Sequence, residues 1–231
     1  MLRKRRIFST FCEEQALIWA LFSGNPYKSS FSSDLIFINK YKNGYFISIV
    51  NREKEEKLYI PLFGKHNILN VVASYVLVNL LKIDVQFQKK IYEFKLPKRR
   101  MEEVKYKSNI LICDYAHHPT EIKALIEAIL EKYEKEIIII FQPHTYSRTL
   151  ALKEDFRKCF EKAKKLYIMN TFTSREQYDQ NKEREVKKVF SFFDDYDEKV
   201  YLSLKKETNK VILFLGAGTV DKEMEKLYNN L

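Results

Sequence analysis

The sequence predicts an α/β fold in which helices cover both faces of a parallel sheet. From residue 109 onward, short apolar runs alternate with amphipathic segments, and repeated βα units of this kind build parallel sheets with right-handed crossovers. Hydrophobic residues make up 45% of the 231 positions and aromatic residues 14%, which is enough for a packed core, so disorder is not the expected state of the chain. In such folds ligands bind where strands end, so functional residues are expected in the loops that follow strands.

The N-terminal part has a different pattern, which predicts a small β-meander. Residues 1–30 fit no pattern, and three β-rich runs follow at 35–38, 45–50 and 58–62. Asn43-Gly44 lies between the first two runs and is a strong hairpin signal. A long apolar stretch without Gly or Pro, from His66 to Leu81, then predicts a buried helix. Asp84 is predicted to cap a second helix that ends near Phe94.

Pro97 marks a predicted boundary, which divides the chain into residues 1–96 and 97–231. Beyond it the predicted strands are 109–113, 137–141, 166–169 and 211–215. The predicted helices are 120–132, 150–164, 183–193 and a closing helix from about Val220.

The net charge of +10 comes from 41 basic and 31 acidic residues. Most basic residues are lysines mixed with glutamates, apart from the dense runs at 3–6 and 98–100, so a solvated Lys/Glu surface is the plain interpretation. A single-strand nucleic-acid binder would need basic residues on one face with aromatic platforms, and no such clustering occurs. Nucleic acid is therefore not an expected partner.

The cysteines and the apolar runs indicate in which cell compartment the chain is expected. The three cysteines form no CxxC pair and no metal-ligand spacing, which fits a reducing cytoplasm and predicts no metal site. No apolar run approaches the roughly 20 residues of a transmembrane helix, so no membrane partner is expected. The N-terminus superficially resembles a signal peptide through Ala16 to Phe22, but Glu13 and Glu14 interrupt the pattern.

The four histidines lie in three polar loops that lead from a predicted strand into a helix. In the first loop His66, Asn67 and Asn70 present hydrogen-bonding groups at one helix end, although ordinary N-capping by Asn67 is the alternative. In the second loop Asp114 follows a strand, where a carboxylate suits a ribose hydroxyl pair, and His117 and His118 could bind an anion. The alternatives for this loop are a zinc site, which would need a third ligand, and a polar loop without a ligand.

The third loop contains His144 and Arg148, and the arginine could form a bidentate pair with a carboxylate or phosphate. A solvated surface arginine is the alternative. Gly216-Ala217-Gly218 follows the last strand and resembles a phosphate loop, although GxG alone is weak. No G-x-x-x-x-G-K-[ST] motif occurs anywhere in the sequence, so no complete ATP-hydrolysing site is expected.

Five segments, GKHNILN, KRRMEEV, DYAHHPTEI, FQPHTYSRT and LGAGTVDK, occur in an order that resembles the UDP-N-acetylmuramate–L-alanine ligases, a Mur ligase family. The resemblance covers about residues 31–231, and DYAHHPTE followed by FQPHTYSRT is its most specific part. It implies a Rossmann-like C-terminal Mur ligase domain over residues 97–231, preceded in residues 1–96 by the truncated end of the central ATPase domain.

The resemblance also implies an activity, which is cytoplasmic peptidoglycan precursor synthesis. In this family ATP phosphorylates the carboxylate of UDP-N-acetylmuramate, and the amine of L-alanine attacks the acyl phosphate. Metal ions, usually Mg²⁺, support the transfer, because such chemistry depends on positioning and on neutralising charge.

The residues that match the family's motifs inherit expected roles. The implied nucleotide-binding residues are His66, Asn67 and Asn70 on the adenine side, Asp114 at the ribose, and Arg99 or Arg100. The residues implied to face the alanine and the joined product are Tyr115, His117, His144 and Arg148, with Arg148 as the partner of the alanine carboxylate.

The sequence departs from the family in three respects. Many members have a second acid where Cys113 stands, and some have Arg where Thr145 stands. The family's nucleotide-binding loop, its metal ligands and its UDP-binding domain have no counterpart here, so the isolated chain is expected to have no ligase activity.

Two further hypotheses remain open. The chain could be the binding half of a split ligase, with Ala16 to Phe22 and the exposed remnant of the central domain facing a separate N-terminal polypeptide. It could also be a non-functional remnant of a broken gene.

Overall fold

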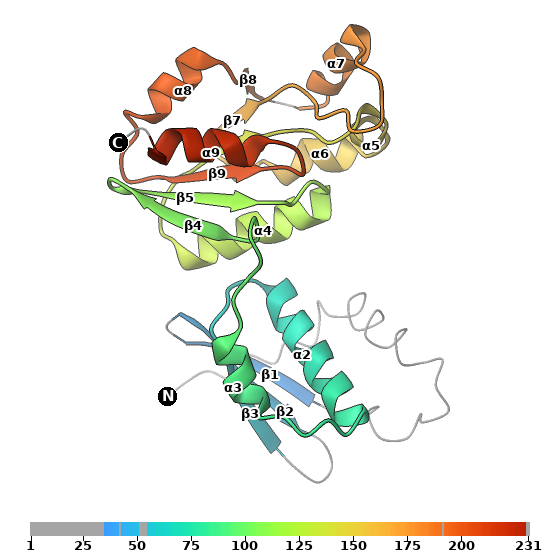
Figure 1. Cartoon of the computed structure of the whole chain (residues 1–231), viewed down its shortest axis with the longest axis vertical. Helices are drawn as coiled ribbons and strands as arrows, with labels where there is room; N and C mark the ends of the chain where they lie inside the picture. Colours follow the sequence, from blue (N-terminus) through green and yellow to red (C-terminus); the bar gives the residue numbers. More distant parts are fainter. Residues whose placement is uncertain (1–34, 42, 51–54, 191, 230–231) are drawn as a thin grey trace. The chain divides into compact units, whose positions relative to one another are not determined.

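The computed structural model describes residues 35–41, 43–50, 55–190 and 192–229, and the chain divides into two compact units, Met1–Phe94 and Lys95–Leu231 (Figure 1). The patterns noted above in residues 1–30, including the apolar run Ala16 to Phe22, lie outside the described residues.

The N-terminal unit contains an antiparallel sheet of β1 (Leu35–Tyr41), β2 (Gly44–Val50) and β3 (Glu55–Ile60), which confirms the predicted meander. Tyr41 pairs with Gly44, so the hairpin prediction is also confirmed, with Gly44 as the first residue of β2. A Cβ atom at Gly44 would overlap the carbonyl oxygen of Ile60 in β3. The glycine is therefore needed for the close approach of β2 and β3, in addition to the turn.

Helix α2 (Lys65–Leu80) packs on this sheet with one face only. Ile68, Val72 and Val76 are buried against the strands at helical spacing. The other face is mixed: Asn70 and Ser74 are exposed there, and Leu77 and Leu80 are 52% and 37% exposed. The prediction of a buried helix is thus correct for one face of α2 and wrong for the other.

Helix α3 (Phe87–Glu93) begins after Gln86, and no side chain caps it. The prediction that Asp84 caps this helix is wrong, because the chain becomes helical only at Phe87, three residues later. Instead, the Gln88 side chain anchors α3 to the sheet: its amide donates to the Tyr59 carbonyl at 2.9 Å, and its oxygen accepts from the Tyr59 N–H at 2.8 Å.

The C-terminal unit is built on a six-stranded sheet with strand order β4-β5-β9-β6-β7-β8. The strands are β4 (Glu102–Tyr106), β5 (Asn109–Asp114), β6 (Ile137–Phe141), β7 (Lys165–Ile168), β8 (Asp194–Asp195) and β9 (Val211–Leu215). All neighbours run parallel except β4, which pairs antiparallel with β5. The predicted α/β fold with a largely parallel sheet is confirmed. Strand β4 was not predicted because its sequence, EEVKY, is mostly charged, as befits an edge strand.

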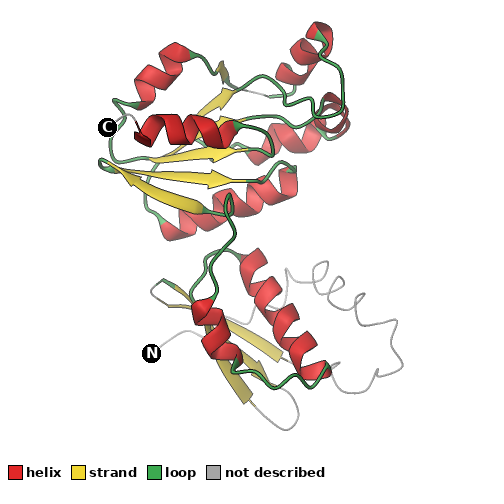
Figure 2. Cartoon of the chain, viewed as in Figure 1, coloured by secondary structure: helices red, strands yellow, loops and turns green. Residues whose placement is uncertain are grey.

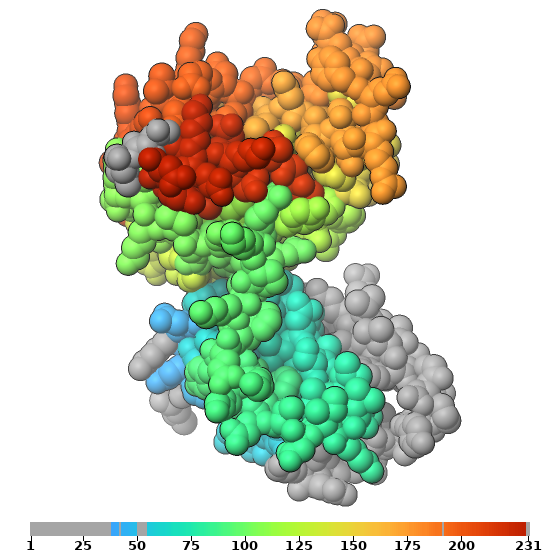
Figure 3. All heavy atoms as spheres, in the orientation of Figure 1, coloured from blue at the N-terminus to red at the C-terminus, as the bar shows by residue number. Residues whose placement is uncertain are grey.

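Helices cover both faces of this sheet (Figure 2). One face packs on α4 (Pro119–Lys132), α5 (Tyr146–Ala151), α6 (Lys153–Cys159) and α7 (Gln180–Lys187). The other face packs on α8 (Glu198–Leu204) and α9 (Val220–Asn229), and the atoms of α9 (red) cover this side in Figure 3. Strand β9 shows the alternation: Leu213 joins the first core and Phe214 the second, and both are fully buried.

Two predicted helices have different boundaries in the structure. The helix predicted at 150–164 is two short helices that begin at Tyr146 and break at Leu152, where φ and ψ are −107° and 25°. The helix predicted at 183–193 begins earlier, because the Asp179 side chain caps it by accepting from the N–H groups of Asn181 and Lys182 at 2.8 and 3.1 Å. Helix α8 was not predicted.

Surface lysines are commonly paired with carboxylates. Lys165 lies 2.8 Å from Glu207, Lys226 lies 3.0 Å from Glu198, and Lys132 pairs with Glu103. These pairs support the interpretation of the basic composition as a mixed Lys/Glu surface. Within the described part of the chain, every helix is too short or too polar to span a bilayer.

Candidate functional site

Three polar loops meet at one edge of the C-terminal sheet. Strands β5, β9 and β6 are parallel neighbours, so the loops that follow them leave the sheet side by side. Backbone hydrogen bonds join the loops: the Gln142 N–H donates to the Leu215 carbonyl at 2.9 Å, and the Gly216 N–H donates to the Asp114 carbonyl at 3.2 Å. Of the residues predicted for a site, those of the C-terminal unit gather here.

Asp114, at the end of β5, is 5% exposed and already has hydrogen-bond partners. Its Oδ1 accepts from the Ala116 N–H and its Oδ2 from the Met101 N–H, both at 2.8 Å. The carboxylate therefore fixes the turn after β5 and the segment before β4.

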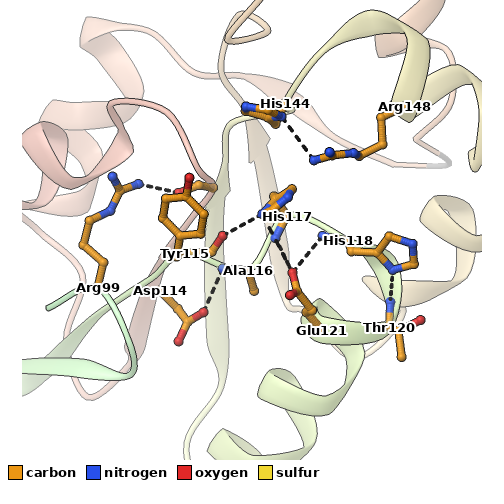
Figure 4. A network of polar contacts seen from close by, with 11 residues as sticks. Arg99, Asp114, Tyr115, Ala116, His117, His118, Thr120, Glu121, His144 and Arg148 are labelled. Atoms are coloured by element: carbon orange, nitrogen blue, oxygen red, sulfur yellow. Dashed lines mark hydrogen bonds and ion pairs between the residues drawn. The ribbon is translucent and has the colours of Figure 1, made fainter. Parts of the chain in front are cut away.

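Arg99 and Arg100 have different surroundings, although they are adjacent in sequence. The Arg99 guanidinium donates to the Gly216 carbonyl at 2.5 Å, lies 3.8 Å from Asp221 and lies over the Tyr115 ring at 4.9 Å. Arg99 thus connects the segment before β4 with the loop after β5 and the loop after β9 (Figure 4). Arg100 is exposed, with its guanidinium 5.7 Å from the centre of the Tyr115 ring, and remains accessible to a ligand.

His117 follows Tyr115 and has a defined tautomer. Its Nδ1 lies 3.0 Å from the Tyr115 carbonyl oxygen, so Nδ1 carries a proton and donates to it. In the neutral ring Nε2 is then left as an acceptor. The side chain is half-buried, and its ring packs edge-on against the Tyr115 ring at 5.5 Å.

His118 has a structural role. It occupies the N-cap of α4, where its Nδ1 accepts from the Thr120 N–H at 3.3 Å and the Glu121 carboxylate accepts from the His118 N–H at 3.3 Å. This reciprocal arrangement is a capping box in which a histidine stands in the usual place of Ser or Thr. Among the residues that the structure describes, no group of three or more His, Cys, Asp or Glu side chains could hold a metal ion.

His144 and Arg148 form a pair in the loop after β6 and the helix that follows it. An Arg148 Nη1–H donates to His144 Nδ1 at 3.1 Å, and the His144 ring lies 5.2 Å from that of His117 (Figure 4). Burial lowers the pKa of His144, and the nearby His117 and Arg148 lower it further. His144 is therefore neutral near pH 7, and because Nδ1 is an acceptor, its proton lies on Nε2.

The glycines of Gly216-Ala217-Gly218 are explained by packing. Gly216 has φ of 142°, and a Cβ there would lie 2.7 Å from the Gln142 carbonyl oxygen. A Cβ at Gly218 would overlap the Gln142 side chain and lie 2.7 Å from Phe172. The Gln142 side chain is 6% exposed, and its oxygen accepts from the Thr219 N–H at 2.6 Å. These contacts account for the glycines without a phosphate.

His66, Asn67 and Asn70 belong to the N-terminal unit. The alternative that Asn67 caps α2 is wrong: Gly64 occupies the N-cap, and Asn67 is 8% exposed and donates to the Phe63 carbonyl at 2.7 Å. Asn70 is exposed, and His66 is half-buried. The Asn67 amide is therefore engaged with the backbone of its own unit, whereas Asn70 is accessible.

Three residues with clear roles at this edge were missed by the sequence analysis: Gln142, Phe172 and Glu176. Phe172 stacks on the His144 ring at 5.8 Å, and the Glu176 carboxylate accepts from the Tyr146 and Ser147 N–H groups at 2.6 and 3.2 Å. Phe172 and Glu176 are 28 residues or more from their partners in sequence, so spacing gave no signal for either.

Comparison with known proteins identifies the family. Residues 99–218, more than half of the chain, match the family described as Mur ligase, glutamate ligase domain. The chain belongs to the Mur ligase family. The predicted resemblance is thereby confirmed, and the parallel sheet of residues 95–231 is the fold of the Mur ligase C-terminal domain.

Individual relatives agree with this assignment. The UDP-N-acetylmuramate–L-alanine ligase of Leuconostoc citreum (strain KM20) is 38% identical over 202 residues, which are 84% of this Mur ligase chain and 46% of the relative. The crystal structure of the UDP-N-acetylmuramate-alanine ligase of Thermotoga maritima has a similar fold, with a TM-score of 0.62 at 22% identity over 82% of this chain and 43% of that one.

A third similar protein is the Thermotoga maritima MurF ligase in complex with ADP, with a TM-score of 0.57 at 15% identity over 85% of this chain and 46% of that one. This Mur ligase chain therefore spans about half the length of the relatives that it matches.

Proposed function

We propose that this chain supplies the amino-acid-binding part of a ligase that joins L-alanine to UDP-N-acetylmuramate in cytoplasmic peptidoglycan precursor synthesis. The observation that carries the proposal is the meeting of Arg148, His144 and His117 at the carboxyl edge of the sheet. The similarity to relatives named for this reaction supports it.

The proposed site suits a small amino acid. Arg148 keeps guanidinium N–H groups beyond the one given to His144, and the neutral His144 has an Nε2–H, so the two side chains offer donors to the alanine carboxylate. The Nε2 lone pair of His117 is available to accept from the alanine amine. In the reaction this amine attacks the acyl phosphate, the amide C–N bond forms, phosphate leaves, and the amine loses a proton.

For the nucleotide we propose Arg100 as the contact with ATP, since Arg99 is engaged within the unit. Asp114, at the end of β5, is proposed for the ribose hydroxyls, as the match to the family's motif implies. A related structure with bound ADP supports nucleotide binding in the family. No group of three or more His, Cys, Asp or Glu side chains that could hold a metal ion occurs among the described residues, so no step here runs through Mg²⁺.

A binding measurement on the 231-residue chain tests the amino-acid site. We expect Arg148→Ala to weaken L-alanine binding at least about tenfold, the equivalent of about 1.4 kcal/mol, with a similar loss for Arg148→Lys, which lacks the planar guanidinium. L-alaninamide, without the carboxylate, should bind weakly to every variant. Arg157→Ala is the matched control, because Arg157 is an exposed arginine paired with Glu154 in α6. Equal affinity of the wild type and Arg148→Ala would refute the site.

We further propose that the 231 residues alone do not ligate and act with a polypeptide corresponding to the rest of the relatives' length. The sequence contains no P-loop motif. Helix α2 supports the proposal, because Leu77 and Leu80 in α2 and Leu81 directly after it are 52%, 37% and 61% exposed, and exposed apolar side chains that lie close together indicate a contact surface.

Co-expression with the part of the Leuconostoc citreum ligase that this chain does not span tests the idea. We expect co-purification, and ADP formation that depends on both UDP-N-acetylmuramate and L-alanine only when both polypeptides are present. Leu77→Glu should abolish the complex, whereas Lys89→Gln, an equal charge change at an exposed position of α3, should not. ADP formation by the chain alone would contradict the proposal. A chain that binds neither L-alanine nor the second polypeptide would be a non-functional remnant.

A further inference from the structure

The start of helix α5 lacks a cap of its own. The helix comprises six residues and follows Thr145, which has φ of 63° and makes no side-chain capping bond. The N–H groups of Tyr146 and Ser147 lie in the first turn of this helix, where they have no acceptor within the helix. The Glu176 carboxylate provides the acceptors: Oε2 accepts from Tyr146 at 2.6 Å and Oε1 from Ser147 at 3.2 Å.

The segment that carries Glu176 also holds the loop before α5. Phe172, in the same connection between β7 and α7, donates its N–H to the Pro143 carbonyl at 2.8 Å and accepts from the Thr145 N–H at 3.1 Å. Its ring stacks on His144 with an interplanar angle of 26°. The connection between β7 and α7 therefore forms hydrogen bonds with residues before α5 and with the first residues of α5.

The geometry of the Arg148–His144 pair depends on this turn. Arg148 lies in the first turn of α5, and its guanidinium reaches back four residues to His144. A helix as short as α5 is not stable by itself, because so few backbone hydrogen bonds do not offset the ordering of the chain. The direction of the Arg148 side chain must then be fixed by contacts from outside the helix.

We propose that Glu176 is a positioning residue that fixes the start of α5 and thereby directs Arg148 and His144 toward the substrate carboxylate. The inference rests on the proposed function for the role of Arg148 and deepens it. A carboxylate suits the task because it offers two acceptor oxygens to two N–H groups, whereas the amide of glutamine offers one oxygen. Glutamate also places a negative charge at the positive end of the helix.

The ionisation of Glu176 is consistent with this role. Burial raises its pKa, but hydrogen bonds from the Ser147 side chain and from the Tyr146 and Ser147 backbones outweigh this, so the pKa is lowered overall. Glu176 is therefore a carboxylate near pH 7. The charged or titratable groups that act on His144 are His117, Arg148 and Glu176.

The pKa of His144, measured by ¹⁵N imidazole NMR on the whole chain, shows whether Glu176 acts by positioning Arg148 or only through its own negative charge. If Glu176 positions Arg148, then Glu176→Gln frees the arginine from His144 Nδ1, and the pKa of His144 rises, as it does in Arg148→Ala. The double variant should show no larger rise than Arg148→Ala alone. If Glu176 acts only through its charge, removing an anion lowers the pKa of His144, and that result, or no change, overturns the proposal.

Binding of L-alanine gives the second readout. We expect a loss of about tenfold in Glu176→Gln and a smaller loss in Glu176→Asp, which keeps both oxygens on a shorter side chain. Glu154→Gln, which removes an exposed carboxylate in α6, is the control and should change neither readout. If the wild type does not bind L-alanine, the proposed function fails, while the titration of His144 still decides whether Glu176 positions the pair.

Discussion

The two units of this chain differ in how completely they bury their apolar residues. The sheet of the C-terminal unit has a packed core on each face, and the side chains of β6 and β9 are buried throughout. Among its described residues, the N-terminal unit has one core, between its sheet and α2. We therefore expect the described core of the C-terminal unit to contribute more to stability than that of the N-terminal unit.

The largest expected effect tests whether the core of the C-terminal unit contributes most to the stability of the chain. Phe214 is fully buried in β9, so Phe214→Ala should destabilise the C-terminal unit by about 3–5 kcal/mol. Ile68→Ala, on the buried face of α2, should cost about 2 kcal/mol, because its surroundings can relax. Hydrogen exchange resolved by segment measures both. Equal losses in the two units would contradict the comparison.

A second comparison between the units uses one glycine of each, Gly216 and Gly44, at a position where the backbone approaches another segment closely. Gly216→Ala combines φ of 142° with a backbone oxygen 2.7 Å from the new Cβ, and we expect a loss of about 2–3 kcal/mol together with weaker nucleotide binding. Gly44→Ala meets the Ile60 carbonyl and should separate β2 from β3 without affecting nucleotide contacts of the C-terminal unit. Urea unfolding and nucleotide titration measure the two outcomes, and a Gly216→Ala chain as stable as the wild type would show that the loop relaxes easily.

The smallest expected effect is a dependence on pH confined to the C-terminal unit. The pKa of His144 is lowered in the folded chain, so on acidification the unfolded state takes up a proton first, and stability falls as the pH drops below about 6.5. Glu176, with its lowered pKa, gives a further loss at more acidic pH as it becomes protonated. Urea midpoints at pH 7.5 and 5.5 should differ in the wild type and differ less in His144→Asn. A difference of the same size in His144→Asn would assign the effect to other groups.

The comparison also explains which features could be predicted from sequence. The strands Ile137–Phe141 and Val211–Leu215 were predicted to the residue, because strands buried on both faces are continuous apolar runs. The edge strand β4 has no such run and was missed.

In the candidate site, the sequence predicted which loops come together. It did not predict which residues of those loops hold the structure and which remain accessible to a ligand. Arg99 and Arg100 are equivalent by composition, and the partner that distinguishes Arg99 is the Gly216 carbonyl, 117 residues away. Glu176 acts on a helix 29 residues earlier and was missed for the same reason. His118 was interpreted with its neighbour as a ligand-binding residue, yet a backbone contact two residues away makes it a cap.

The contact between Gln88 and Tyr59 has a consequence for solubility. By donating to and accepting from the backbone of β3, the glutamine side chain occupies hydrogen-bonding positions that an added strand would use. The outer strand of a sheet with exposed aromatic rings is otherwise a template for intermolecular β-pairing and aggregation. The Gln88 amide thus blocks β-pairing at Tyr59, so this part of β3 does not offer its backbone to another copy of the chain.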